Sequence, residues 1–116
     1  ANGLSHLEDP TLARGLYASY HRYMREYCSH EPNRLKGLIL APAADIEWAV
    51  TEIKSLVNDS WVSAVMVILP EGMPVDHPAL DSIWEVMNDA HLPILHHSFT
   101  FEPPYFPGYR DMDDNR

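Results

Sequence analysis

The strongest constraint on the fold of this chain is an apolar run at residues 62–69 with no alternation of polar residues. A continuous run of that length is typical of a parallel strand buried on both faces. Segments with helical periodicity lie on both sides of it. Strands that alternate with helices predict right-handed crossovers and a parallel sheet. We therefore expect an α/β fold in the order α-β-α-β-α-β, with strands at 35–41, 62–69 and 93–97.

The helix starts carry clear signals. Asp9 precedes Pro10, which pairs a capping carboxylate with a proline whose missing N–H costs nothing at that position. By the same logic we expect Asp45 to cap the second helix and residues 76–78 to open the third. The first helix should end near His30, because the residue before Pro32 disfavours helix. Its expected buried face consists of Leu12, Leu16, Tyr20, Met24 and Tyr27.

A chain of 116 residues is one domain at most. We divide it into a flexible start at 1–8, an α/β core at 9–98 and a tail at 99–116 rich in proline and aromatic residues. A closed (β/α)8 barrel takes about 250 residues. The chain is therefore a small open α/β sandwich or a slice of such a barrel, and the exposed aromatics of the tail favour the slice. A flavodoxin-like domain fits less well, since no acidic or glycine-rich turn follows the first strand.

The charge balance limits the partners. Eight Lys and Arg face 17 Asp and Glu, a net charge of −9, and no basic residue lies between Lys54 and Arg110. Such a surface repels phosphate, so we expect no nucleic acid and no anionic membrane as partner. No apolar run approaches the ~20 residues of a membrane span, and the N-terminus lacks a signal-peptide pattern. Cys28 is the single cysteine, expected to be a passive thiol, which fits a reducing, cytoplasmic location.

Two adjacent histidines end the third expected strand. His96 and His97 come where parallel α/β sheets place their sites, and imidazole is the commonest metal ligand. Adjacent strand residues point to opposite faces, so only one of the two can face a barrel interior. The alternative is a hydrogen-bonded histidine pair without a metal. The other histidines are expected at the surface: His6, His21, His30, His77 and His91. The tryptophans are expected in the core or in contacts between helices: Trp48, Trp61 and Trp84.

Several segments resemble a known family. Residues 31–42 (EPNRLKGLILAP), 45–53 and 93–97 (PILHH) are similar to the middle of the amidohydrolase-related superfamily. The resemblance is to the branch that includes aminocarboxymuconate-semialdehyde decarboxylase and the resorcylate decarboxylases. The tail at 101–111 (FEPPYFPGYRD) resembles a segment of some bacterial members.

The resemblance implies a metal-dependent (β/α)8 barrel, often dimeric, that hydrolyses or decarboxylates small carboxylated substrates. It places a metal ligand four positions after the proline that opens the fifth strand, which is His97 here. The implied ion is divalent, with zinc the first expectation, and His96, Phe101 and Tyr105 would line the substrate pocket. The other ligands and the catalytic residues of the family have no match in this chain.

Two hypotheses follow. In the first, the chain is the central part of a metal-dependent hydrolase or decarboxylase, completed by a longer chain or another chain and assembled as a homo-oligomer. The metal would lower the pKa of a bound water or polarise a substrate carboxylate. In the second, it is a non-catalytic α/β module that associates through exposed sheet edges and a patch at Tyr105 and Phe106.

Overall fold

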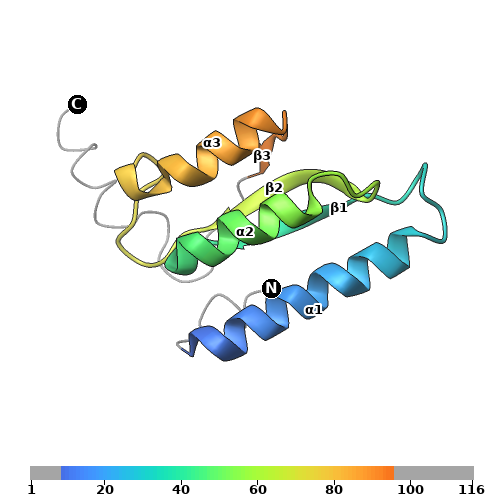
Figure 1. Ribbon diagram of the computed structural model, residues 1–116, viewed down its shortest axis with the longest axis horizontal. Coiled ribbons are helices and arrows are strands. Elements are labelled where there is room, and N and C mark those ends of the chain that lie inside the picture. Colours follow the sequence, from blue (N-terminus) through green and yellow to red (C-terminus); the bar gives the residue numbers. More distant parts are fainter. Residues whose placement is uncertain (1–8, 96–116) are drawn as a thin grey trace.

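The computed structural model describes residues 9–95 and confirms the alternation of helices and strands (Figure 1). Its three parallel strands form one open sheet in the order β1-β2-β3. The elements in chain order are α1 (Pro10–Cys28), β1 (Gly37–Pro42), η2 (Ala43–Asp45), α2 (Ile46–Leu56), β2 (Val62–Ile68), η3 (Pro78–Leu80), α3 (Asp81–Asp89) and β3 (Ile94–Leu95).

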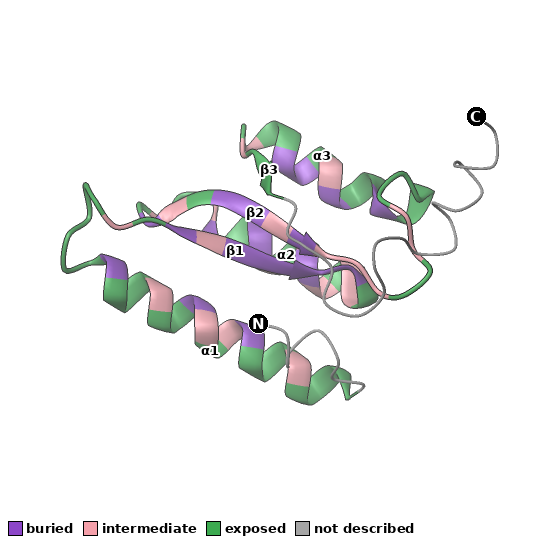
Figure 2. Ribbon diagram, turned by 180° about the vertical axis from the view of Figure 1, so that it is seen from behind, coloured by how far each residue is buried: buried purple, intermediate pink, exposed green. Residues whose placement is uncertain are grey.

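The register of the sheet sorts its residues into two faces. Ile39 pairs with Val65 and Ala41 with Val67, and these four side chains lie in the core. With right-handed crossovers, a strand order that never reverses places the intervening helices on one face. Helices α2 and α3 pack against each other there. Seen from behind in Figure 2, no helix of the described residues lies over the opposite face of the sheet.

The core therefore lies in one layer between the sheet and helices α2 and α3. Its most deeply buried members in the two helical segments are Ala49, Ile53, Leu80 and Ile83, each fully covered. The buried residues of these segments repeat at helical spacing: Ala49, Ile53, Leu80, Ile83 and Met87. Partly buried side chains pack against them: Ile46, Val50, Val57 and Trp84.

Helix α1 lies beside α2, along the outer edge of β1 (Figure 1). Its start is as expected, since the Asp9 carboxylate accepts hydrogen bonds from the backbone N–H groups of Thr11 and Leu12. It ends at Cys28, near His30 as expected, and Ser29 begins the turn that follows.

The expected buried face of α1 is mostly wrong. Leu12, Leu16 and Tyr27 are 40–51% exposed. Tyr20 and Met24 are partly buried, and Met24 packs against the core. The buried residues are Tyr17, His21 and Cys28. These follow the helical spacing of four and seven residues, on a face rotated from the apolar stripe. The physical reason is that α1 docks on a sheet edge and on α2, where polar partners occupy part of the contact.

One further expectation is corrected. Asp45 makes no capping hydrogen bond to α2, and its carboxylate binds Arg14 of α1 instead. The third strand, expected at 93–97, is an edge strand with no fourth strand beside it in the described residues, and Ile94 is 52% and Leu95 39% exposed. Among the described helices, none is long and apolar enough to cross a membrane. Within residues 9–95 the sheet is open, and its three strands do not close into a barrel.

Candidate functional site

The carboxyl ends of the three parallel strands lie at one edge of the sheet, at Pro42, Ile68 and Leu95. Parallel α/β sheets bind their ligands outside this edge. His96 and His97 directly follow Leu95 in the sequence. These two histidines, with Phe101 and Tyr105, lie outside the described residues, as do His6 and the tail at 99–116.

The described loops at this edge supply three carboxylates: Asp45, Glu71 and Asp76. Glu71 and Asp76 are exposed residues after β2, where turns favour polar residues. Asp45 follows β1 and binds the Arg14 guanidinium, with Nη2 donating to Oδ1 at 3.0 Å. This ion pair lowers the pKa of Asp45 and raises the pKa of Arg14. The ion pair between Asp45 and Arg14 thus holds α1 against the start of α2.

Within residues 9–95 no three histidine, cysteine, aspartate or glutamate side chains are grouped so that they could hold a metal. An open hollow of about 440 Å³ lies elsewhere, between the C-terminal ends of α2 and α3. Those helices run back against the strands, so the hollow is remote from the carboxyl edge. Its lining includes Lys54 and Asp89, with Val57, Asn58, Val86 and Ala90.

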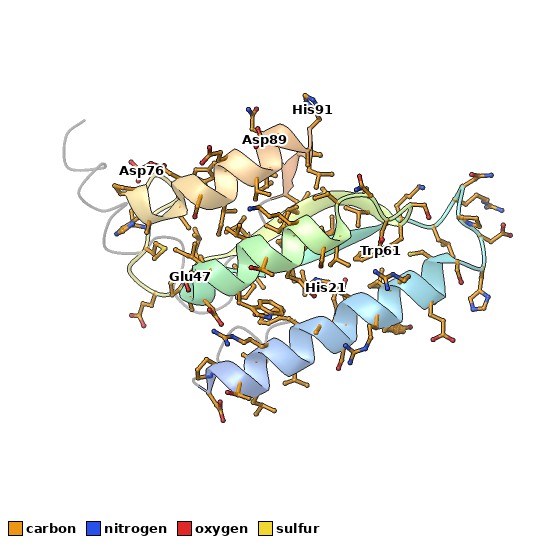
Figure 3. The ribbon with its side chains drawn as sticks, in the orientation of Figure 1. His21, Glu47, Trp61, Asp76, Asp89 and His91 are labelled. Atoms are coloured by element: carbon orange, nitrogen blue, oxygen red, sulfur yellow. The ribbon has the colours of Figure 1, made fainter. Side chains whose placement is uncertain are left out.

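The most distinctive polar residue of the described chain is His21, which we expected at the surface. Its side chain is only 2% exposed, and it is the sole buried polar residue between 9 and 95. Figure 3 shows it between α1 and the sheet, near Trp61. The ring centroids of His21 and Trp61 are 6.1 Å apart, and that of Tyr20 lies 5.7 Å from His21.

Both ring nitrogens of His21 have partners. The backbone N–H of Leu40 donates to Nε2 at 2.9 Å, and Nδ1 lies 2.8 Å from Oε2 of Glu52. An N–H donor in front of Nε2 requires a lone pair there, so the proton is on Nδ1 and is donated to the carboxylate. His21 thus joins α1, β1 and α2 through one neutral ring.

Burial lowers the pKa of His21, while the hydrogen bond to Glu52 and its charge oppose that shift. The remaining described histidines are exposed, as expected: His30 in the turn after α1, His77 before η3 and His91 after α3. Nδ1 of His77 also accepts a backbone N–H, from Ala79 at 3.0 Å, but in the open.

The apolar residues of α1 taken alone do not predict the burial of His21. The signal was present: Tyr17, His21, Met24 and Cys28 repeat at intervals of four, three and four residues. A histidine inside such a repeat can occupy a buried face when it has polar partners. The tryptophans were interpreted correctly, since Trp61 is buried and Trp48 packs 6.2 Å from the ring of Tyr17.

Comparison of the chain with protein-family models, with curated proteins and with solved structures found no match in any of the three.

Proposed function

We propose that this chain is the central part of a metal-dependent amidohydrolase-type enzyme that hydrolyses or decarboxylates a small carboxylated substrate. The observation that carries the proposal is the arrangement of the sheet. Three parallel strands follow each other without reversal, with their intervening helices on one face and their carboxyl ends at one edge. This is the arrangement of consecutive units in a (β/α)8 barrel, whereas doubly wound sheets reverse their strand order.

The sheet face opposite α2 and α3 supports the same interpretation. Of the residues that alternate with the core-facing ones, Leu38, Met66 and Ile68 are only partly buried, whereas Leu40 and Ala64 are buried. In a barrel this face would be the interior, which is packed by side chains from the other strands. The proposal therefore includes further strands from a longer chain or another chain, with the whole in the cytoplasm.

The described residues do not form a metal site by themselves. In the proposal His97 supplies one imidazole ligand, which suits zinc, and the other ligands come from the rest of the assembly. When bound, such an ion supplies an activated water or a polarised carboxylate. His96, Phe101 and Tyr105 would contribute to the substrate pocket.

A native mass spectrum of the chain as isolated, supplemented with zinc, tests the proposal. The expected result is an assembly well above 13.2 kDa that carries a divalent ion. The ion should be lost from His97→Ala and kept in His91→Ala, the matched control at an exposed histidine after α3. A metal-free monomer of 13.2 kDa would overturn it.

The second candidate is a non-catalytic module that associates with a second copy of itself, and the exposed edge strand β3 favours it. Ile94 and Leu95 are 52% and 39% exposed on a strand whose outer side has no neighbour in the described chain. Unpaired edge strands promote pairing between chains. A metal-free oligomer that Leu95→Lys dissociates would favour this candidate over the enzyme.

A further inference from the structure

The outer edge of β1 is closed by a side chain from α1 rather than by another strand. In a parallel ladder alternate residues direct their backbone N–H groups to opposite sides. The Gly37 N–H donates toward β2, to the carbonyl of Trp61 at 2.7 Å, whereas the Leu40 N–H points outward, to α1. His21 Nε2 receives that N–H at 2.9 Å. The contact both satisfies the edge amide and holds α1 in place.

This contact depends on one lone pair. A second proton on the ring would sit on Nε2 and face the Leu40 N–H, so that two donors would oppose each other. The hydrogen bond to the edge would be lost, and a buried amide would be left without an acceptor. Leaving such a group unsatisfied is costly compared with the modest net gain from making the bond.

The surroundings decide how strongly a proton is disfavoured. Glu52 of α2 faces Nδ1 and favours a positive ring. Strand β1 has no titratable side chain and directs the Leu40 backbone N–H to the ring, and the turn before β2 contributes the uncharged indole of Trp61. On α1 itself the neighbour is Tyr20, a phenol whose pKa burial raises further. The carboxylate of Glu52 therefore favours protonation of the His21 ring, whereas the nearly complete burial of the ring disfavours it.

We infer that His21 is an acid-sensitive latch: the neutral ring holds α1 on the edge of β1, and uptake of a proton at Nε2 releases α1. Release uncovers the β1 edge while the layer formed by the sheet, α2 and α3 stays folded. This inference concerns a device in the fold and does not depend on the proposed enzymatic role.

The direction of the pH dependence follows from the two states. Burial lowers the pKa of His21 in the latched state, whereas a released ring has its ordinary pKa near 6.5. The released state therefore binds more protons wherever the two differ. The latch is at full strength above about pH 6.5 and weakens as the pH falls below that value. Weakening stops once the pH is below the lowered pKa of the latched ring.

Hydrogen exchange of single amides by NMR tests the latch in the full chain. After correction for the pH dependence of free amides, protection of the Leu40 amide should fall by up to tenfold per pH unit below about pH 6.5. The Val65 amide, which donates to the carbonyl of Pro93 on the other side of the sheet, should keep its protection. Equal loss at Leu40 and Val65 would mean global unfolding and would overturn the inference.

The variant His21→Gln separates the latch from other titrations. A glutamine can accept from Leu40 and donate to Glu52 without titrating, so the protection of Leu40 should become independent of pH. The matched control is His77→Gln, which replaces an exposed histidine that also accepts a backbone N–H. In His77→Gln, the protection of the Leu40 amide should depend on pH as it does in the unaltered chain. An unchanged profile in His21→Gln would overturn the latch.

A measurement on the unaltered chain guards against misfolding of the variant. The ¹⁵N chemical shifts of the His21 ring at pH 7.5 should show a proton on Nδ1 and a lone pair on Nε2. Titration should give a pKa below the ordinary value for histidine. A proton on Nε2 at pH 7.5, or a pKa at or above 6.5, would contradict the latch.

Discussion

Helices α1 and α3 both pack beside α2, but they are held there by different chemistry. Helix α3 contributes the fully buried Ile83 and the buried Met87 to the apolar core. Helix α1 also contacts its neighbours through polar pairs: Arg14 with Asp45, Arg25 with Asp59, and His21 with both Glu52 and Leu40. Of its apolar side chains, Tyr17 and Cys28 are buried and Met24 packs against the core, whereas Leu12, Leu16, Tyr23 and Tyr27 are exposed.

This difference predicts how pH and salt should affect the packing of each helix. Apolar burial depends little on pH and moderate salt, while hydrogen bonds to a histidine and exposed ion pairs depend on both. Helix α1 should therefore be the first part of the described fold to detach, and the layer of α2, α3 and the sheet the last. Mutations in α1 should therefore affect the attachment of that helix, whereas mutations in α3 should affect the stability of the whole layer of α2, α3 and the sheet.

The largest effect is expected from the apolar side. Ile83→Ala removes a fully buried side chain from the core and should lower the free energy of unfolding by about 2–5 kcal/mol. Urea denaturation followed by circular dichroism measures it, and the loss should affect all helices together. Glu85→Ala, an exposed neighbour on α3, is the control and should change little. A small loss in Ile83→Ala would show that this layer is not tightly packed.

A smaller and more local effect is expected at His21. His21→Ala leaves the Leu40 N–H without its acceptor and should cost about 1–3 kcal/mol at neutral pH. Hydrogen exchange should show the loss in α1 and at the β1 edge, with α3 unaffected. His30→Ala, at an exposed position after α1, is the matched control. If α3 lost protection equally, the two helices would not be independent and the comparison would fail.

The close approach at Gly37 gives the next prediction. A Cβ there would lie 2.5 Å from Cε of Met24 and 3.1 Å from Cε3 of Trp61. The methionine end can move, but the indole is buried, so Gly37→Ala should destabilise by about 1 kcal/mol in urea denaturation. Gly15→Ala is the contrasting control, since nothing lies within 4 Å of the new atom. It should stabilise α1 by about 0.5–1 kcal/mol. Loss of stability in both would point to a cause other than crowding.

The smallest effect is expected at the exposed ion pair of α1. Arg25 is 55% exposed, so Arg25→Met should cost less than about 1 kcal/mol, and 0.5 M NaCl should remove most of the difference. Urea midpoints at low and high salt measure this. Arg22→Met, at a neighbouring exposed arginine, is the control. A large, salt-independent loss in Arg25→Met would show that the aliphatic stem, rather than the charge, holds α1.

Much of the fold could be predicted from local patterns. The strand at 62–69, the start at Asp9 and the burial of Ile53 and Ile83 follow from hydrophobic periodicity and capping chemistry, which act over a few residues. The candidate site was less accessible. His96 and His97 remain a prediction, since they lie outside the described residues. His21 was missed because its two partners come from residues 19 and 31 positions away in the chain.

The sequence by itself determined the order of helices and strands and the parallel sheet, because periodicity and turn residues are local properties of a chain. It also determined the acidic balance, which follows from composition. Only the tertiary structure decided which face of α1 is buried, that Asp45 binds Arg14 rather than capping α2, and that β3 is exposed. Each of these depends on which groups from distant segments meet. A polar side chain can be buried where a hydrogen-bond partner reaches it, and no local pattern specifies that partner.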